Sequence, residues 1–193
     1  MDRYSPVELL ALFQRAQALF TDRVDAVDPD QWEDEALPGW TVADLVAHLV
    51  GEHLWAPPLL AGEPHTDIQV PDDTPTLLGD DPFTGWENAA DGSLAAFAED
   101  HALTRTVHLQ RGPTPATQYV LEMTSDLTVH SWDLARATGG DPRLDRELVD
   151  VALVLAEQLP DDGVPGFFDP QLAVPPSADA QTRLLARFGR KDD

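Results

Sequence analysis

The sequence contains no cysteine. Disulfide bonds, thiolate metal ligands and a cysteine nucleophile are therefore excluded, and any thiol chemistry needs a thiol from another molecule. Basic residues are also scarce, because 12 Lys and Arg stand against 35 Asp and Glu and give a formal net charge of −23. Such an acidic surface repels phosphate backbones and anionic lipid headgroups, so we expect neither a nucleic-acid partner nor a membrane partner.

Long apolar runs and targeting patterns are missing as well. No stretch approaches the length of a membrane span, and residues 1–10 do not join a basic segment to an apolar one. We therefore expect a soluble, cytoplasmic protein. Residues 112–117, "GPTPAT", are typical of a turn rather than of a phosphate-binding loop, and no serine lies in the pattern of a hydrolase nucleophile.

Helical periodicity is the main pattern that is present. Hydrophobic residues make up 42% of the chain, which is enough for a core, and they recur at helical spacing in several long segments. Capping boxes at Ser5 and Thr41 mark two helix starts, whereas Pro57 and Pro58 should kink or end the second helix. The predicted helices span residues 6–27, 41–58, 82–99, 115–138 and 145–159, with a short one at 178–188.

The segments between these helices differ in character. Residues 62–82 are rich in Pro, Asp and Gly and form a long loop, either a functional lid or a mobile connection. Residues 105–112 are a short strand or an extended connector. Together these features predict an all-α four-helix bundle with an extra C-terminal helix and an irregular tail. We expect residues 1–160 to form the bundle and residues 161–193 to form an extension packed on the same domain.

Three polar residues lie in apolar helical surroundings. Asp126 and His130 are four residues apart and share one helix face, and His48 lies on the second helix. Because a buried imidazole or carboxylate is costly unless it is paired, a divalent metal held by all three is one interpretation. The other is a simple hydrogen bond between Asp126 and His130, with His48 satisfied elsewhere. Spacing alone favours the second interpretation, and both remain open.

Neighbouring residues have less certain roles. Glu52, one turn after His48, is a fourth ligand, a base, a supporting group or a surface acid, whereas His53 points to another face and should be solvated or face the loop. Asp133 either orients His130 or pairs with Arg136 on the surface. The three remaining histidines should be solvated: His65, His101 and His108.

Several stretches resemble a known group of proteins. They are "LPGWTVADLVAHLVGEHLWAPPLLAGE", "LLGDDPFTGWENA", "SDLTVHSWDLARATG", "RLD" and "RLLARFGR", in this order over nearly the whole chain. The sequence is similar to metal-binding proteins related to the N-terminal domain of mycothiol-dependent maleylpyruvate isomerase, within the DinB-like superfamily of four-helix bundles. The resemblance implies a DinB-like bundle.

The resemblance also implies a metal site and its ligands. A divalent metal, zinc first and nickel as the alternative, would be held by His48, Asp126 and His130. The isomerase has glutamate where this chain has Asp126, so the ligand here is shorter. The isomerase also has a further C-terminal domain that we do not expect in this chain, and its own substrate is therefore not carried over.

Two functional hypotheses from different classes follow. The first is a metal-dependent transferase or isomerase that uses mycothiol and a small electrophilic substrate, with Glu52 as the catalytic base and Arg136 as the residue that contacts the thiol cofactor. The second is a non-catalytic module that binds a metal or a small molecule and acts through a partner or as a homodimer. An open metal position beside a hollow favours the first hypothesis.

Overall fold

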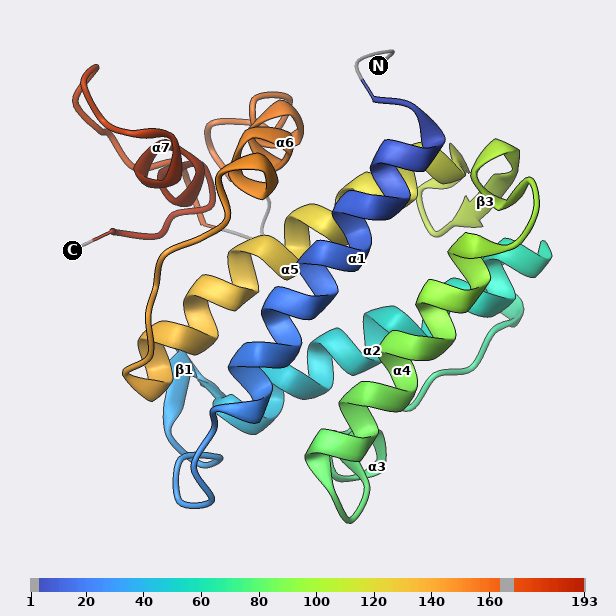
Figure 1. Cartoon of the computed structure of the whole chain (residues 1–193), viewed down its shortest axis with the longest axis horizontal. Helices are drawn as coiled ribbons and strands as arrows, with labels where there is room; N and C mark the ends of the chain where they lie inside the picture. Colours follow the sequence, from blue (N-terminus) through green and yellow to red (C-terminus); the bar gives the residue numbers. More distant parts are fainter. Residues whose placement is uncertain (1–3, 164–168, 193) are drawn as a thin grey trace.

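The computed structural model describes residues 4–163 and 169–192, and four long helices surround its main core (Figure 1). Helix α1 contacts α5 and α4, and α2 contacts the same two helices from the other side, so the four close into a ring. The predicted all-α four-helix bundle is confirmed. Its members are α1 (Pro6–Asp25), α2 (Val42–Ala61), α4 (Pro82–Ala98) and α5 (Ala116–Thr138).

Both predicted capping boxes form. The Ser5 hydroxyl accepts a hydrogen bond from the Glu8 amide, and the Glu8 side chain accepts one from the Ser5 amide. Thr41 and Asp44 make the same reciprocal pair at the start of α2. These contacts satisfy backbone donors that have no partner inside the helix, and they fix where α1 and α2 begin.

Helix α2 continues through two prolines, so of the two predicted effects, a kink or an end, the end is wrong. The helix runs through Pro57 and Pro58 to Ala61 and stops at Gly62, which has a positive φ of 97°. Its last turn remains packed because Leu59 and Leu60 are buried, with 1% and 2% of their surface exposed. Packing of this last turn outweighs the backbone hydrogen bonds that the prolines cannot donate.

Helix α5 buries a row of hydroxyl side chains and carries two of the three candidate ligands, Asp126 and His130. Each hydroxyl donates to the carbonyl four residues earlier, at 2.7 or 2.8 Å, so none needs an outside partner. Their small size suits close packing against neighbouring helices. These residues are Thr124, Ser125, Thr128 and Ser131. The helix ends at Gly139, with φ at 73°, as the sequence predicts.

The loop after α2 is partly ordered against that helix. It contains the 3₁₀ helix η1 (His65–Asp67) and the short helix α3 (Thr74–Leu78). The Thr74 hydroxyl donates to Asp44 at 2.6 Å, and the rings of His65 and Trp55 stack with centroids 4.1 Å apart. His65 is therefore only partly solvated, because one face of its ring is covered.

Two small hairpins complete the bundle. Strands β1 (Glu35–Leu37) and β2 (Trp40–Thr41) lead into α2. After α4 comes the 3₁₀ helix η2 (Ala102–Thr104). Strand β3 (Thr106–Leu109) follows it and confirms the short strand expected at residues 105–112. Strand β4 (Gly112–Pro115) pairs with it in antiparallel register, so these four residues form a strand where we predicted a turn.

The C-terminal helices lie along α5 at the upper left of Figure 1. Helix α6 (Arg146–Ala156) packs on α5, and α7 (Ala180–Arg187) packs on α6. Leu184 of α7 is fully buried in a second cluster with Val129 of α5. The extra C-terminal helix is confirmed. Part of the predicted irregular tail, residues 164–168, lies outside the described residues, and the division at residue 160 stays a prediction.

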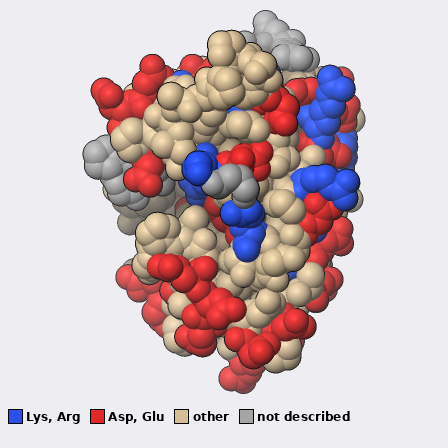
Figure 2. Space-filling view, turned by 90° about the vertical axis from the view of Figure 1, so that its left-hand side faces the viewer, with Lys and Arg blue, Asp and Glu red and all other residues tan. Residues whose placement is uncertain are grey.

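Acidic side chains dominate the surface. Figure 2 shows Asp and Glu over much of one face, and its lower half carries almost no Lys or Arg. In the part of the chain that the structure describes, no helix combines the length and apolar character needed to cross a membrane.

His53 lies in the bundle core, so the prediction that it is solvated is wrong. It is 1% exposed, and its ring packs against Phe13 and Trp86, with centroids 5.9 and 4.9 Å away. Its Nδ1 lies 2.7 Å from the carbonyl of Leu49 and must carry the proton of that hydrogen bond. Five residues after His48, the side chain turns toward α1 and α4 rather than toward solvent.

The buried imidazole predicts a pH dependence of stability. Burial lowers the pKa of His53 to about 4. Since the unfolded histidine takes up a proton near its ordinary pKa and the folded one does not, this residue destabilises the fold progressively as pH falls from about 6.5 to 4. The loss should reach roughly 2 kcal/mol at pH 5. Urea unfolding at pH 7 and pH 5 measures it.

The variant His53→Phe should lose that part of the pH dependence, because a phenyl ring fills the site without a titrating group. His108→Phe, on the exposed face of β3, is the control for the change of side chain. Equal losses of stability in wild type and His53→Phe between the two pH values would contradict the assignment.

Candidate metal centre

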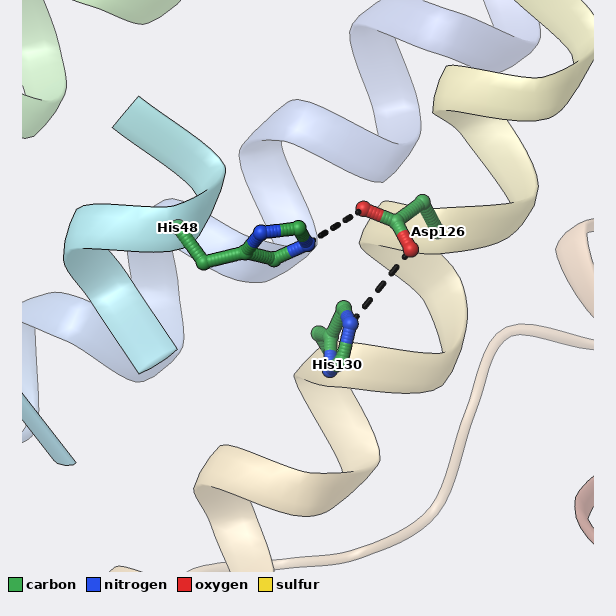
Figure 3. A group of neighbouring side chains, drawn as sticks. All are labelled: His48, Asp126 and His130. Carbon is green, nitrogen blue, oxygen red and sulfur yellow. Dashed lines mark ion pairs between the residues drawn. The ribbon is translucent and has the colours of Figure 1, made fainter. Parts of the chain in front are cut away.

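Helices α2 and α5 bring His48, Asp126 and His130 together (Figure 3). One ligand atom from each residue lies within 4.8 Å of the other two. The Asp126 carboxylate faces both histidines, with one oxygen 3.5 Å from His48 Nε2 and the other 3.4 Å from His130 Nε2. The two imidazole centroids are 5.3 Å apart, and the rings are nearly perpendicular. Three residues from two helices therefore face one point.

These separations fit a bound divalent ion. Direct hydrogen bonds between nitrogen and oxygen are usually shorter, at about 2.7–3.2 Å. Metal bonds of about 2.0–2.2 Å, arranged tetrahedrally, hold ligand atoms roughly 3.3–3.6 Å apart. The two distances, 3.5 Å from His48 to one Asp126 oxygen and 3.4 Å from His130 to the other, are of this size. Two imidazoles and one carboxylate suit zinc, nickel, iron or manganese, and three protein ligands leave coordination positions open.

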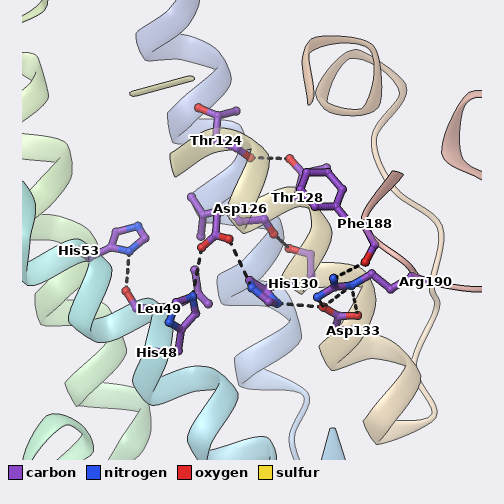
Figure 4. Close-up of polar contacts among 12 residues, drawn as sticks. His48, Leu49, His53, Thr124, Asp126, Thr128, His130, Asp133, Phe188 and Arg190 are labelled. Atoms are coloured by element: carbon purple, nitrogen blue, oxygen red, sulfur yellow. Dashed lines mark hydrogen bonds and ion pairs between the residues drawn. The ribbon is translucent and has the colours of Figure 1, made fainter. Parts of the chain in front are cut away.

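Asp133 fixes the orientation of His130. Its carboxylate lies 2.9 Å from His130 Nδ1 and is itself 1% exposed (Figure 4). Nδ1 therefore carries a hydrogen and donates to Asp133, which leaves Nε2 to face Asp126. Of the two roles considered for Asp133, the structure supports orientation of His130. On its other side Asp133 pairs with Arg190, not with Arg136.

The site attracts positive charge. Burial alone would lower the pKa of His130, but the carboxylates of Asp126 and Asp133 outweigh it and raise the pKa to about 9. Burial likewise opposes ionisation of Asp126, yet the nearby His130 and His48 hold its pKa well below the ordinary value. Without a metal, a proton on His130 balances these carboxylates. A divalent cation can take that place, since it binds the same Nε2 atom.

A hollow of about 370 Å³ lies beside His48. Glu52, one turn further along α2, lines it, and Asp72 from the loop before α3 lies on its rim. Trp40, whose ring is 5.2 Å from that of His48, and Trp55 supply aromatic walls. The hollow gives a small molecule space next to the ligand group.

Glu52 is half-buried in this wall. Burial, followed by the negative charge of Asp126, raises the pKa of its carboxyl. Among the described residues it accepts no hydrogen bond. The structure therefore places the Glu52 carboxyl beside the ligand group without a hydrogen-bond partner among the described residues. Its catalytic role stays a prediction.

Arg136 lies away from the hollow. It is exposed on α5, with its guanidinium 5.5 Å from the centre of the Trp132 ring, and it is not among the residues that line the hollow. Its proposed contact with a thiol cofactor stays a prediction. Arg190 instead pairs with Asp133, the residue that orients His130. Sequence reasoning missed this arginine.

The comparisons place the chain in a family. The mycothiol maleylpyruvate isomerase N-terminal domain matches residues 35–135, more than half of the chain and the segment that contains the three candidate ligands. The chain belongs to this family. Two relatives, both uncharacterized proteins from strains of Mycobacterium tuberculosis, are 30% identical over 155 residues that cover 78% of each chain.

A solved structure gives the same fold. The crystal structure of the mycothiol-dependent maleylpyruvate isomerase matches with a TM-score of 0.66 and 18% sequence identity. The match covers 80% of this chain and 70% of the isomerase chain. The DinB-like relationship expected from the sequence is thereby confirmed.

The ligand group predicts how single substitutions change metal affinity. His48→Ala and His130→Ala each remove one nitrogen ligand, so Zn²⁺ should bind more than about 100-fold more weakly. Asp126→Glu keeps the carboxylate and should retain binding, whereas Asp126→Ala should not. Competition with a chromogenic chelator at fixed pH measures these constants. His108→Ala is the matched control, and wild-type affinity in His130→Ala would rule out this ligand set.

Proposed function

We propose that the protein is a divalent-metal-dependent enzyme that uses the thiol of mycothiol, or of a similar small thiol, to attack a small electrophilic substrate. In a transferase the thiol would stay attached to the substrate, whereas in an isomerase it would leave again from the rearranged substrate. The observation that carries the proposal is the hollow of about 370 Å³ lined by His48, beside a three-residue group that would leave metal positions open.

The residues of the site divide the work. His48, Asp126 and His130 would hold the metal, and Asp133 keeps His130 in the tautomer that offers Nε2. When bound, a metal such as Zn²⁺ stabilises the thiolate form of a thiol at neutral pH. The thiol must come from outside because the chain has no cysteine of its own. This need agrees with the mycothiol dependence of the structurally similar isomerase.

Glu52 is the candidate base. It lines the hollow beside His48, and its pKa is raised by burial and by the charge of Asp126. A carboxylate whose pKa lies closer to neutral accepts a proton from an entering thiol more readily than an ordinary glutamate. In an isomerisation the same carboxyl can return that proton when the thiol leaves.

The charge of the hollow restricts the substrate. Asp44, Glu52 and Asp72 line it together with two tryptophans, and no Lys or Arg is among its lining residues. Maleylpyruvate, the substrate of the named isomerase, is a dicarboxylate, and such a dianion would be repelled here. Neutral or cationic electrophiles with an apolar part fit the walls better. We therefore infer that this chain acts on a different substrate from that isomerase.

The test is thiol-dependent turnover by the Zn²⁺-loaded protein. Mycothiol is mixed with neutral, cationic and dianionic electrophiles in turn, and both the loss of free thiol, expected for a transferase, and the conversion of the electrophile, expected for an isomerase, are followed. We expect turnover with neutral or cationic electrophiles and little with the dianions. Glu52→Gln should lower kcat by about 10²–10⁴-fold and leave the metal content unchanged, since Glu52 is not a proposed ligand. Glu87→Gln, an exposed glutamate on α4, is the control.

Absence of any thiol-dependent activity would contradict the enzymatic proposal. If the metal-loaded protein neither binds thiol nor consumes it with any electrophile, the enzymatic proposal is wrong. The non-catalytic alternative, a metal- or small-molecule-binding module that acts through a partner or as a homodimer, would then replace it.

A further inference from the structure

Arg190, near the C-terminal end of the sequence, contacts Asp133, the residue that orients His130. Arg190 donates from Nε to both oxygens of Asp133, at 3.0 and 3.2 Å, and from a terminal nitrogen at 2.7 Å, across 57 residues of sequence. The Asp133 side chain is 1% exposed and that of Arg190 16%. A buried carboxylate with this many charged donors is held in one orientation.

Asp133 links this arginine to a ligand. Its Oδ2 atom accepts from Arg190 at 2.7 Å and lies 2.9 Å from His130 Nδ1. The opposite nitrogen of the same imidazole faces Asp126 at 3.4 Å. Figure 4 shows the resulting row of side chains, from Arg190 through Asp133 and His130 to Asp126.

The backbone turn before Arg190 fixes the position of this residue. After α7 the chain turns at Gly189, with a φ of 75°, and the Arg190 amide donates to the carbonyl of Leu185 at 2.9 Å. A Cβ at Gly189 would lie 2.6 Å from the Cβ of Asp169, so a larger residue would force the turn to shift. The guanidinium also donates to the carbonyl of Phe188 at 2.9 Å. Arg190 is thus held at both its backbone and its side chain.

We propose that Arg190 is a positioning residue of the metal centre. The inference rests on the proposed metal binding. Arg190 holds the Asp133 carboxylate, which in turn holds the His130 ring with Nε2 directed at the ligand group. Without the arginine, Asp133 can rotate away from Nδ1, and His130 loses both its fixed orientation and its fixed tautomer.

Arg187 provides a matched control on the same segment. Its side chain is 14% exposed and fastens α7 to the end of α6 through the carbonyl of Ala156 and the carboxylate of Asp161. Among the described residues it forms no hydrogen bond or ion pair with Asp133 or His130. Loss of Arg187 therefore removes side-chain contacts between α7 and the end of α6, while the hydrogen bonds from Arg190 to Asp133 remain.

The experiment compares Arg190→Gln, Arg190→Lys and Arg187→Gln. Zn²⁺ affinity is measured by chelator competition, and the Co²⁺-loaded proteins are compared by their d–d absorption spectra. We expect Arg190→Gln to bind Zn²⁺ about 10–100-fold more weakly, with an altered Co²⁺ spectrum. Arg190→Lys should recover part of the affinity, because lysine keeps the charge but not the two-pronged geometry. Arg187→Gln should keep the wild-type spectrum and affinity.

The outcomes separate this inference from the proposed function. A wild type that binds neither Zn²⁺ nor Co²⁺ would overturn the metal centre itself and the inference with it. A wild type that binds, with unchanged affinity and spectrum in Arg190→Gln, would overturn the inference alone, as would equal weakening in Arg190→Gln and Arg187→Gln. If Arg190→Gln does not fold by circular dichroism, Arg190→Lys decides the question by its Co²⁺ spectrum.

Discussion

The carboxylate of Asp126, which lies between two imidazoles, is the interaction on which the rest of the site depends. Its oxygens face His48 at 3.5 Å and His130 at 3.4 Å, and Asp133 adds a second carboxylate behind His130. Carboxylates gathered in a partly buried place require a balancing positive charge. A proton on His130 can supply it, and so can a divalent ion, because one ligand atom from each of the three residues lies within 4.8 Å of the other two.

The bundle and the C-terminal segment contribute differently to this arrangement. The packing of α2 against α5 sets the distance between His48 and the Asp126–His130 pair, whereas Arg190 reaches Asp133 from behind. The hollow borders His48 and Glu52. The ligand group thus has paired charges behind His130 and space for a small molecule beside His48.

The sequence predicts much of this because the decisive signals are local. Spacing puts Asp126 and His130 on one helix face, and the resemblance of the "GWTVADLVAHL" stretch adds His48 as the third candidate ligand. The role proposed for Arg190 has no local signal in the sequence. It depends on the docking of α7, which brings Arg190 to Asp133 across 57 residues of sequence. His53 was misjudged for a related reason: helical spacing shows that it leaves the face of His48, but only tertiary packing shows that its own face meets Phe13 and Trp86.

The most direct measurement of the central claim is anomalous diffraction at the zinc edge from crystals of the Zn²⁺-loaded protein. The account predicts one strong peak within about 2.0–2.2 Å of His48 Nε2, His130 Nε2 and an oxygen of Asp126, with at least one further position filled by solvent or thiol. A fully loaded crystal with no peak between these three residues, and with His130 bonded directly to Asp126, would contradict it.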